Sequence, residues 1–171
     1  MVDASFLNLK KTSLKRLYYI LLTVAITAAA IRCTTIDLYE RTVPVPGHAW
    51  SSTFKPSFDF TIKGSSARYD VYLILRHNEK YGFNNIYLNL LVKIPGVDSV
   101  MKLRREVVIA DNEGWKAASG MDDIYEQRLP LAEIPAMKPG NYNFTLEQIM
   151  REDPLQHVLD VGIRIERKQL Q

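Results

Sequence analysis

The chain has 171 residues, of which 47% are hydrophobic and 24% charged, so it can form one folded domain with a short leader, and global disorder is not expected. Its formal net charge of +3 is concentrated in the first 32 residues, which hold five of the 22 basic residues and one of the 19 acidic residues. The other 17 basic and 18 acidic residues give no excess of positive charge for a phosphate backbone, so nucleic acid is not an expected partner.

Residues 1–32 are organised as a signal peptide. Basic residues between Lys10 and Arg16 precede the apolar run LYYILLTVAITAAAI at residues 17–31. As a helix, this run would extend for about 22 Å at about 1.5 Å per residue. A hydrocarbon core is about 30 Å thick, so the run is short for a membrane-spanning helix and typical of a signal peptide. We therefore predict an N-terminal signal or anchor helix ahead of the folded domain.

Cys33 is the only cysteine in the chain and follows the apolar run after one residue, Arg32. A single thiol in an exported chain has no disulfide partner, and its position is the one at which a lipoprotein signal is cut and acylated. We predict lipidation of Cys33. Arg32 stands where such signals normally have Gly, Ala or Ser, so two alternatives stay open: cleavage after the Ala28-x-Ala30 pattern, and an uncleaved anchor.

The next stretch, RTVPVPGHAW at residues 41–50, contains two prolines and a glycine. Proline and glycine interrupt regular structure, so we predict that residues 33–53 form the lipidated cysteine and a proline-rich tether. A weak strand is expected near residues 39–43. The folded domain is predicted to occupy residues 54–171.

In that domain, apolar and polar residues alternate with a period of two. The clearest segments are 57–63, 69–77, 85–94, 101–109, 142–150 and 161–168, and a weaker strand is expected near 125–131. Turn-forming residues separate them at 63–66, 81–84, 95–96, 111–114 and 139–141. Such alternation is typical of strands that are buried on one face. We therefore predict an all-β fold: an antiparallel two-sheet β-sandwich of about seven to nine strands.

Aromatic residues outside the main apolar stripes are the best candidates for a binding surface. Tyr72 and Tyr87 lie opposite the apolar faces of their predicted strands, Tyr81 and Phe83 lie in the loop between those strands, and Arg76 is nearby. Exposed aromatic residues with arginine are typical of protein contact surfaces, and they also suit a platform for sugars. The alternative explanation for these aromatic residues is that both faces of the central strands are partly covered by other parts of the chain.

The histidines show no pattern of a metal site. His48, His77 and His157 lie far apart and lack metal-ligand spacing, and His77 is interpreted as a solvated strand end. The sequence also lacks the common motifs of nucleophilic and nucleotide-dependent enzymes.

Acidic residues give no stronger signal of catalysis. Asp122, Asp123 and Glu126 are interpreted as a solvated loop rather than paired catalytic carboxylates, and DNEG at residues 111–114 as a turn rather than a calcium loop. We predict no catalytic residue, no metal and no cofactor other than the covalent lipid on Cys33, so the chain is not expected to be an enzyme.

Three segments resemble a known family. The segment YDVYLILRHNEKYGFNNIYLNLLVKIPG at residues 69–96, followed by GNYNFTLEQIMR at 140–151 and LDVGIRIERK at 159–168, is similar to the gliding-motility lipoproteins (GldH) of Bacteroidetes. The ordered set of segments carries the resemblance, which runs from about Tyr39 to Lys168.

This resemblance implies an exported, lipid-anchored accessory of the gliding machinery with no established enzymatic reaction. The acylated cysteine of the family maps onto Cys33. The implied partners are other envelope proteins of the motility or associated secretion apparatus, with the membrane reached through the lipid, and the implied location is the periplasmic side of the outer membrane. A carbohydrate-binding β-sandwich lipoprotein of the envelope is the alternative.

Overall fold

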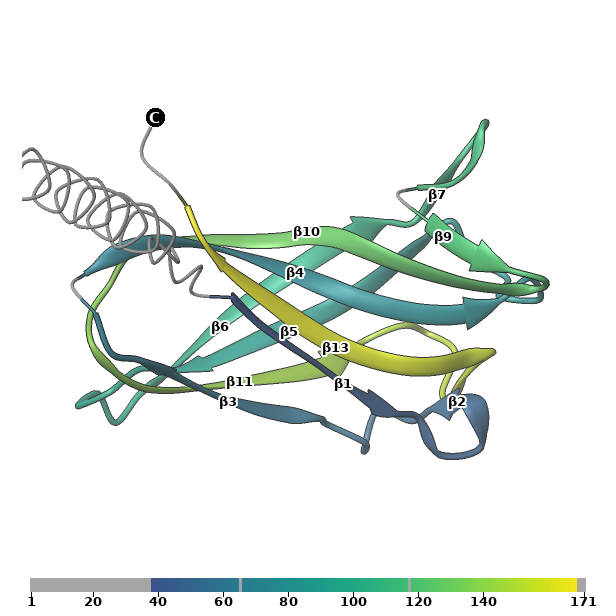
Figure 1. Cartoon of the computed structure of the whole chain (residues 1–171). Coiled ribbons are helices and arrows are strands. Elements are labelled where there is room, and N and C mark those ends of the chain that lie inside the picture. The colour runs from purple at the N-terminus through teal and green to yellow at the C-terminus, as the bar shows by residue number, and fades with distance from the viewer. Residues whose placement is uncertain (1–37, 65, 117, 169–171) are drawn as a thin grey trace, which may run out of the picture. The chain divides into compact units, whose positions relative to one another are not determined.

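The computed structural model describes residues 38–64, 66–116 and 118–168 (Figure 1). Within these ranges the regular structure is β-strand, apart from one short 3-10 turn, η1 (Pro46–His48). The predicted signal or anchor helix and Cys33 lie outside the described residues. In the part that is described, no helix has the length and hydropathy needed to cross a membrane.

Two antiparallel sheets form the body of the fold (Figure 1). The five-stranded sheet has the order β1 (Leu38–Pro44), β13 (Val158–Arg167), β4 (Ala67–Asn78), β10 (Ile124–Met137), β9 (Ala118–Met121). The four-stranded sheet has the order β3 (Ser57–Ile62), β11 (Gly140–Gln148), β5 (Asn85–Lys93), β6 (Val100–Val108). Two short pairs complete the fold: β2 (Ala49–Trp50) with β12 (Leu155–Gln156), and β7 (Ala110–Asp111) with β8 (Gly114–Trp115).

The core lies between the two sheets, where each strand buries alternate residues. Phe58, Phe144 and Leu90 from the four-stranded sheet are fully buried, as are Leu73 and Ile163 from the five-stranded sheet. Full burial of such a side chain stabilises a fold by about 1.5–3 kcal/mol. The prediction of an all-β, antiparallel two-sheet sandwich is confirmed.

The predicted proline-rich tether is where the structure differs most from expectation. The weak strand near residues 39–43 is present as β1, and β1 pairs with β13 over all seven of its residues. Beyond it, Val45 is 2% exposed and Trp50 0% exposed, and Trp50 Nε1 donates to the Phe54 carbonyl at 2.9 Å. Because these side chains complete the core, residues 38–53 belong to the sandwich, which begins well before residue 54.

β10 is twice as long as the strand predicted near residues 125–131. It contains Pro130 and continues through Pro135 to Met137, six residues beyond the predicted end. The pairing of β10 with β4 shifts register between Pro130 and Ala132 and again between Ile134 and Met137. Such irregularities accommodate residues that cannot donate a backbone hydrogen bond, so the strand survives both prolines.

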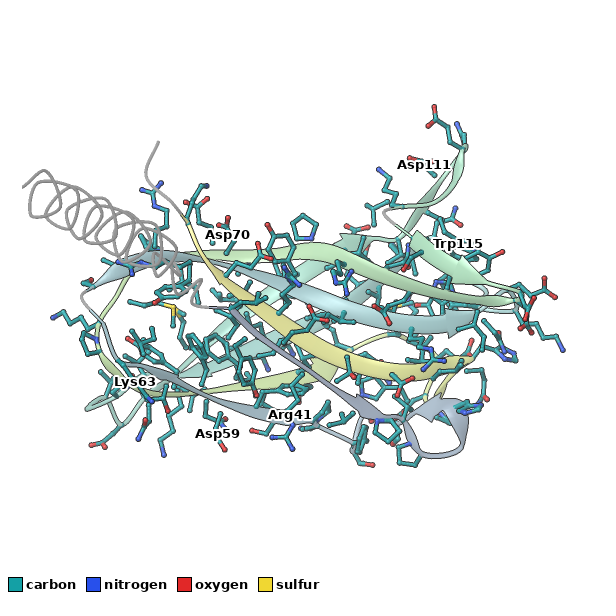
Figure 2. The ribbon with its side chains drawn as sticks, viewed as in Figure 1. Arg41, Asp59, Lys63, Asp70, Asp111 and Trp115 are labelled. Atoms are coloured by element: carbon teal, nitrogen blue, oxygen red, sulfur yellow. The ribbon has the colours of Figure 1, made fainter. Side chains whose placement is uncertain are left out.

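Because neighbouring strands are antiparallel, their ends gather at two ends of the sandwich. β1 begins and β13 ends at one of them, which we name the Leu38 end. The opposite end carries the β7–β8 hairpin, and we name it the Trp115 end (Figure 2). β4 has twelve residues and runs from the first end to the second, a distance of about 36 Å at about 3.3 Å per residue.

Gly162 in β13 allows β1 to approach closely. A Cβ atom at this position would lie 2.2 Å from the Arg41 carbonyl oxygen and 2.7 Å from the Thr42 Cα. Both of these are backbone atoms, which cannot rotate away as a flexible side chain can. The pairing of β1 with β13 therefore requires glycine here.

Gln127 and His77 make a buried polar connection at the Trp115 end. Gln127 Nε2 donates to the carbonyls of Ile109 and Lys116, both at 2.7 Å, and its Oε1 lies 3.1 Å from His77 Nε2. His77 and Gln127 are both 0% exposed. The Gln127 amide thus joins β10 to the two residues that flank the β7–β8 hairpin.

We predict that Gly162→Ala lowers the free energy of unfolding by about 1–3 kcal/mol, because the methyl group overpacks the β1–β13 contact. Urea unfolding followed by circular dichroism measures the change. Gly82→Ala is the matched control, since nothing lies within 4 Å of a Cβ at Gly82, and it is expected to stay within about 0.5 kcal/mol of the wild type. Equal stability of the two variants would contradict the requirement for glycine.

We also predict that Gln127→Met lowers the free energy of unfolding by about 1–3 kcal/mol, because the variant loses the hydrogen bonds from the buried amide to the Ile109 and Lys116 carbonyls and the contact with His77. Amide exchange at Lys116, whose N–H donates to the Ile109 carbonyl at 2.8 Å, should accelerate as the hairpin base loosens. Gln156→Met, at an exposed position, serves as the control. Unchanged exchange at Lys116 in the Gln127 variant would argue against this role.

Candidate interaction surface

The five residues predicted to form an interaction surface lie in three different places. Tyr81 is only 4% exposed, and its ring packs against His77 at 5.3 Å and Phe83 at 5.9 Å between centroids. Burial raises the pKa of the Tyr81 hydroxyl. Tyr81 therefore belongs to the interior of the Trp115 end and offers no ring to a partner.

His77 is also buried, so the interpretation of a solvated strand end was wrong. Its ring lies edge-on to Trp115 at 4.5 Å and stacks on Tyr125 at 5.8 Å between centroids. Its Nδ1 contacts the Asn78 carbonyl at 2.8 Å, while Nε2 contacts Gln127. The hairpin that delivers Trp115 was not predicted to fold back over this strand, and it is what removes His77 from solvent.

Tyr72 and Arg76 lie on the outer face of the five-stranded sheet. Arg76 Nη1 lies 3.1 Å from Asp160 Oδ2 on the neighbouring β13. Tyr72 is half-buried beside Pro130 and Arg164, its partners on the two flanking strands, and burial raises the pKa of its hydroxyl. Both side chains are thus held by neighbours within the sheet.

Ion pairs cover the centre of this outer face. Glu40 contacts Arg164 at 2.6 Å and Arg128 at 3.3 Å. The hydrogen bond from Arg164 lowers the pKa of Glu40. Because β13 and β4 separate Glu40 from Arg128, their side chains extend over Ile74, which is 1% exposed although it points outward. The face is therefore closed by its own charged residues.

Phe83 and Tyr87 lie on the other side of the sandwich, where they line a hollow of about 500 Å³. Its remaining lining residues come from β5, β6 and the segment after β11: Asn85, Arg104, Ile149, Met150, Arg151. The Ile149 N–H donates to the Tyr87 carbonyl at 2.9 Å, and the Tyr87 N–H lies 3.2 Å from Met150 Sδ. These two contacts hold the segment after β11 against the start of β5. We name this site the Tyr87 hollow.

The Tyr87 hollow combines apolar and charged groups. Glu106, opposite Tyr87 on β6, accepts a hydrogen bond from the phenol and raises its pKa. Phe83 and Met150 supply adaptable apolar area, and Arg104 and Arg151 supply cationic groups at its edge. Aromatic residues, methionine and arginine are the residue types enriched at protein interfaces.

Sequence reasoning found Phe83 and Tyr87 but missed Arg104, Met150 and Arg151. These three lie 17 to 64 residues away from Tyr87, on segments that only the sheet topology brings together. The pairing of Asn89 with Arg104 and with Glu147 fixes β6 and β11 on either side of β5. Alternation along single strands carries no information on which strands become neighbours.

Polar pairs occupy the part of the four-stranded sheet's outer face around Glu147 and Asn143. Glu147 contacts Lys55 at 2.5 Å and accepts from Asn89 Nδ2 at 2.7 Å. The hydrogen bond from Lys55 is the largest of the effects that lower the pKa of Glu147 to about 2. Asn143 Nδ2 donates to Asp59 at 2.8 Å. These side chains hold one another beside the Tyr87 hollow.

The acidic segments considered for catalysis or metal binding are turns. Asp122 and Asp123 are exposed between β9 and β10, and Asp122 has a φ of 59°. The DNEG segment forms the β7–β8 turn, in which the Glu113 N–H donates to Asp111 Oδ1 at 2.9 Å (Figure 2). Among the described residues, no three His, Cys, Asp or Glu side chains are grouped so as to hold a metal ion.

Comparison with known proteins identifies the family. The GldH lipoprotein family model matches residues 37–165. Gliding motility lipoprotein GldH of Flavobacterium johnsoniae is 32% identical over 130 residues, covering 71% of this chain and 80% of that protein. A GldH homolog of Christiangramia forsetii is 25% identical over 128 residues, covering 70% and 78%.

Among solved structures, the VP2 subviral particle of infectious bursal disease virus aligns with a TM-score of 0.26 and 12% identity, over 79% of this chain and 34% of that one. This score is too low to support an inference. The family match covers both sheets of the sandwich and agrees with the resemblance found in the sequence. The chain belongs to the GldH lipoprotein family.

Proposed function

We propose that the chain is a lipid-anchored envelope lipoprotein, acylated on Cys33, at the periplasmic side of the outer membrane. Three observations support the anchor: the family is one of lipoproteins, Cys33 is the only cysteine, and it lies one residue after the apolar run of the leader. A mature lipoprotein with two or three acyl chains is held far more firmly than a protein with one chain.

The proposed activity is non-catalytic: the protein binds other envelope proteins of the gliding or associated secretion machinery. The observation that carries this proposal is the Tyr87 hollow, in which Phe83, Tyr87 and Met150 lie together beside two arginines. Binding energy in protein interfaces is concentrated in a few such aromatic and arginine residues. Tethering to a membrane adds to it by raising the effective concentration of the binding site.

Carbohydrate binding is the second candidate for the same hollow. The ring of Tyr87 lies next to Asn85 and Glu106, whose amide and carboxylate can exchange hydrogen bonds with sugar hydroxyls. The Asn85 amide already donates to Glu106 at 2.6 Å, so a sugar would have to compete with this bond. This competition, together with the two arginines, makes a protein partner the better fit.

We predict that the Cys33→Ser variant is not acylated. Mass spectrometry of the mature wild-type protein should find a diacylated or triacylated cysteine at its N-terminus. The variant should lack the lipid and accumulate unprocessed, because no other cysteine can accept it. An unmodified wild-type N-terminus at Ile31 would instead indicate ordinary signal cleavage and would reject the lipid anchor.

We predict that Tyr87→Ala combined with Arg104→Ala weakens the complex with envelope partners by about 30-fold, as expected for loss of about 2 kcal/mol at an interface. The measurement is quantitative recovery of cross-linked partners from solubilised membranes. Tyr72→Ala is the matched control, since it removes a half-buried tyrosine from the outer face of the other sheet.

Both variants should keep the wild-type melting temperature within a few degrees, which separates binding from folding. Retention of all partners by the double variant would reject the Tyr87 hollow as the contact surface. Loss of binding to envelope polysaccharide, with protein partners unchanged, would favour the carbohydrate alternative.

A further inference from the structure

The two ends of the sandwich differ in charge. Each end comprises its connections and described chain ends, with the two strand residues next to each of them. The Leu38 end has two acidic residues, Asp98 and Glu166, and six basic ones: Lys63, Arg68, Lys93, Lys138, Arg167, Lys168. By the same definition the Trp115 end has eight acidic and four basic residues. These sets carry net charges of +4 and −4, while the described body as a whole is close to neutral. Two of the basic residues at the Leu38 end, Arg68 and Lys168, form ion pairs with Glu133, which lies further along β10.

Exposed apolar side chains show the same asymmetry. In the described ranges, four large hydrophobic residues are strongly exposed: Leu38 at 45%, Val97 at 42%, Val100 at 51% and Val108 at 47%. The first three lie at the Leu38 end, and only Val108 lies toward the other end. Exposed apolar residues next to basic ones are the combination found on surfaces that bind anionic lipid.

An apolar hollow of about 330 Å³ lies at the Leu38 end beside Val97. Ile94, Pro95, Met101, Ile134 and Pro139 are among its lining residues, and Lys138 is the one charged residue in the lining. The apolar surface at this end therefore continues inward between the β5–β6 and β10–β11 connections.

The connections that carry these residues are firmly held. Tyr142 Oη accepts from the Lys138 N–H and donates to the Lys138 carbonyl, both at 3.0 Å. Pro95 lies so close to Gly140 that a Cβ there would be 2.6 Å from the proline ring. The β5–β6 and β10–β11 connections are thus packed on each other and present one fixed surface.

Chain length connects this end to the membrane. Leu38 is five residues after Cys33, and five residues span at most about 18 Å when fully extended. β4 alone is about 36 Å long, so the Trp115 end cannot come as close to a lipid on Cys33 as the Leu38 end can.

We propose that the Leu38 end rests on an anionic lipid surface, with Leu38, Val97 and Val100 in contact with the bilayer and the basic residues next to its headgroups. This proposal rests on the lipid anchor at Cys33 and adds to it a defined orientation of the sandwich. The −4 charge of the Trp115 end opposes the inverted orientation, since anionic lipids repel it.

The test uses the full-length, processed lipoprotein in vesicles of phosphatidylethanolamine and phosphatidylglycerol. Single cysteines are introduced as Val100→Cys and Val108→Cys and labelled with an environment-sensitive fluorophore. The lipid occupies the Cys33 sulfur, so the introduced cysteine is the only free thiol. The two positions are matched: both valines are on β6, they are about equally exposed, and they lie about 26 Å apart.

A quencher attached to the lipid should reduce the fluorescence of the Val100 label at least about threefold more than that of the Val108 label, because only the former lies at the interface. Vesicles of phosphatidylcholine alone should reduce this difference, since they lack the anionic charge. Val97→Cys should behave as Val100→Cys does.

Equal quenching of the two labels in protein that stays bound to vesicles would overturn the proposed orientation and leave the lipid anchor intact. Protein that fails to bind vesicles and carries no acyl chain would overturn both. The circular dichroism spectra of the variants must match the wild type, and a change of exposed valine to cysteine on an intact strand is expected to meet this condition.

Discussion

The pairing of β1 with β13 is the constraint on which the rest of the structure depends. It joins the residues nearest to Cys33 to the last strand of the chain, from Leu38 opposite Glu166 to Pro44 opposite Asp160. Gly162 makes this approach possible, because its missing side chain leaves room for the backbone of Arg41 and Thr42. The strand pairing therefore sets the number of residues between the first paired residue, Leu38, and Cys33.

The same pairing shapes the outer face of the five-stranded sheet. It places Glu40 beside Arg164, and from there the carboxylate also reaches Arg128. Exposed ion pairs contribute little stability one at a time, but this set shields the outward-facing Ile74. Because the charged side chains on this face form ion pairs with one another, few of them are available to bind a partner. The other sheet, with the Tyr87 hollow, is left as the face suited to recognition.

The period-two alternation was enough to predict the sandwich and six of its strands. It works because a strand that is buried on one face shows this burial as an alternation of apolar and polar residues over a few neighbouring positions. It failed at residues 41–50, where Pro44 and Pro46 suggested a tether. Pro44 is the last residue of a strand at the edge of the sheet, where a missing N–H has little cost, so the strand forms. β10 extends beyond the predicted residues 125–131 to Met137, and its irregular pairing with β4 accommodates Pro135.

The candidate surface was less predictable than the fold. Sequence places Tyr81, Phe83 and Tyr87 within seven residues, but Tyr81 is buried whereas Phe83 and Tyr87 line a surface hollow. Tyr81 is covered by the ring of Trp115, at 6.4 Å between centroids, and Trp115 arrives from a hairpin more than thirty residues later. Exposure of an aromatic residue depends on such distant segments, and these leave no trace in the local pattern.

The positions of the Tyr87 hollow and the Leu38 end are compatible with simultaneous use. Tyr87 is six residues from Lys93 along β5, which corresponds to about 20 Å. A sandwich that rests on its Leu38 end therefore holds the hollow beyond the lipid headgroups, open to other envelope proteins. If the hollow lay among the basic residues of the Leu38 end, membrane and protein partner would compete for one surface. In the proposed orientation, separation along the strands removes this competition, because the membrane would contact the ends of the strands and the outer face of the sheet would stay open to a partner.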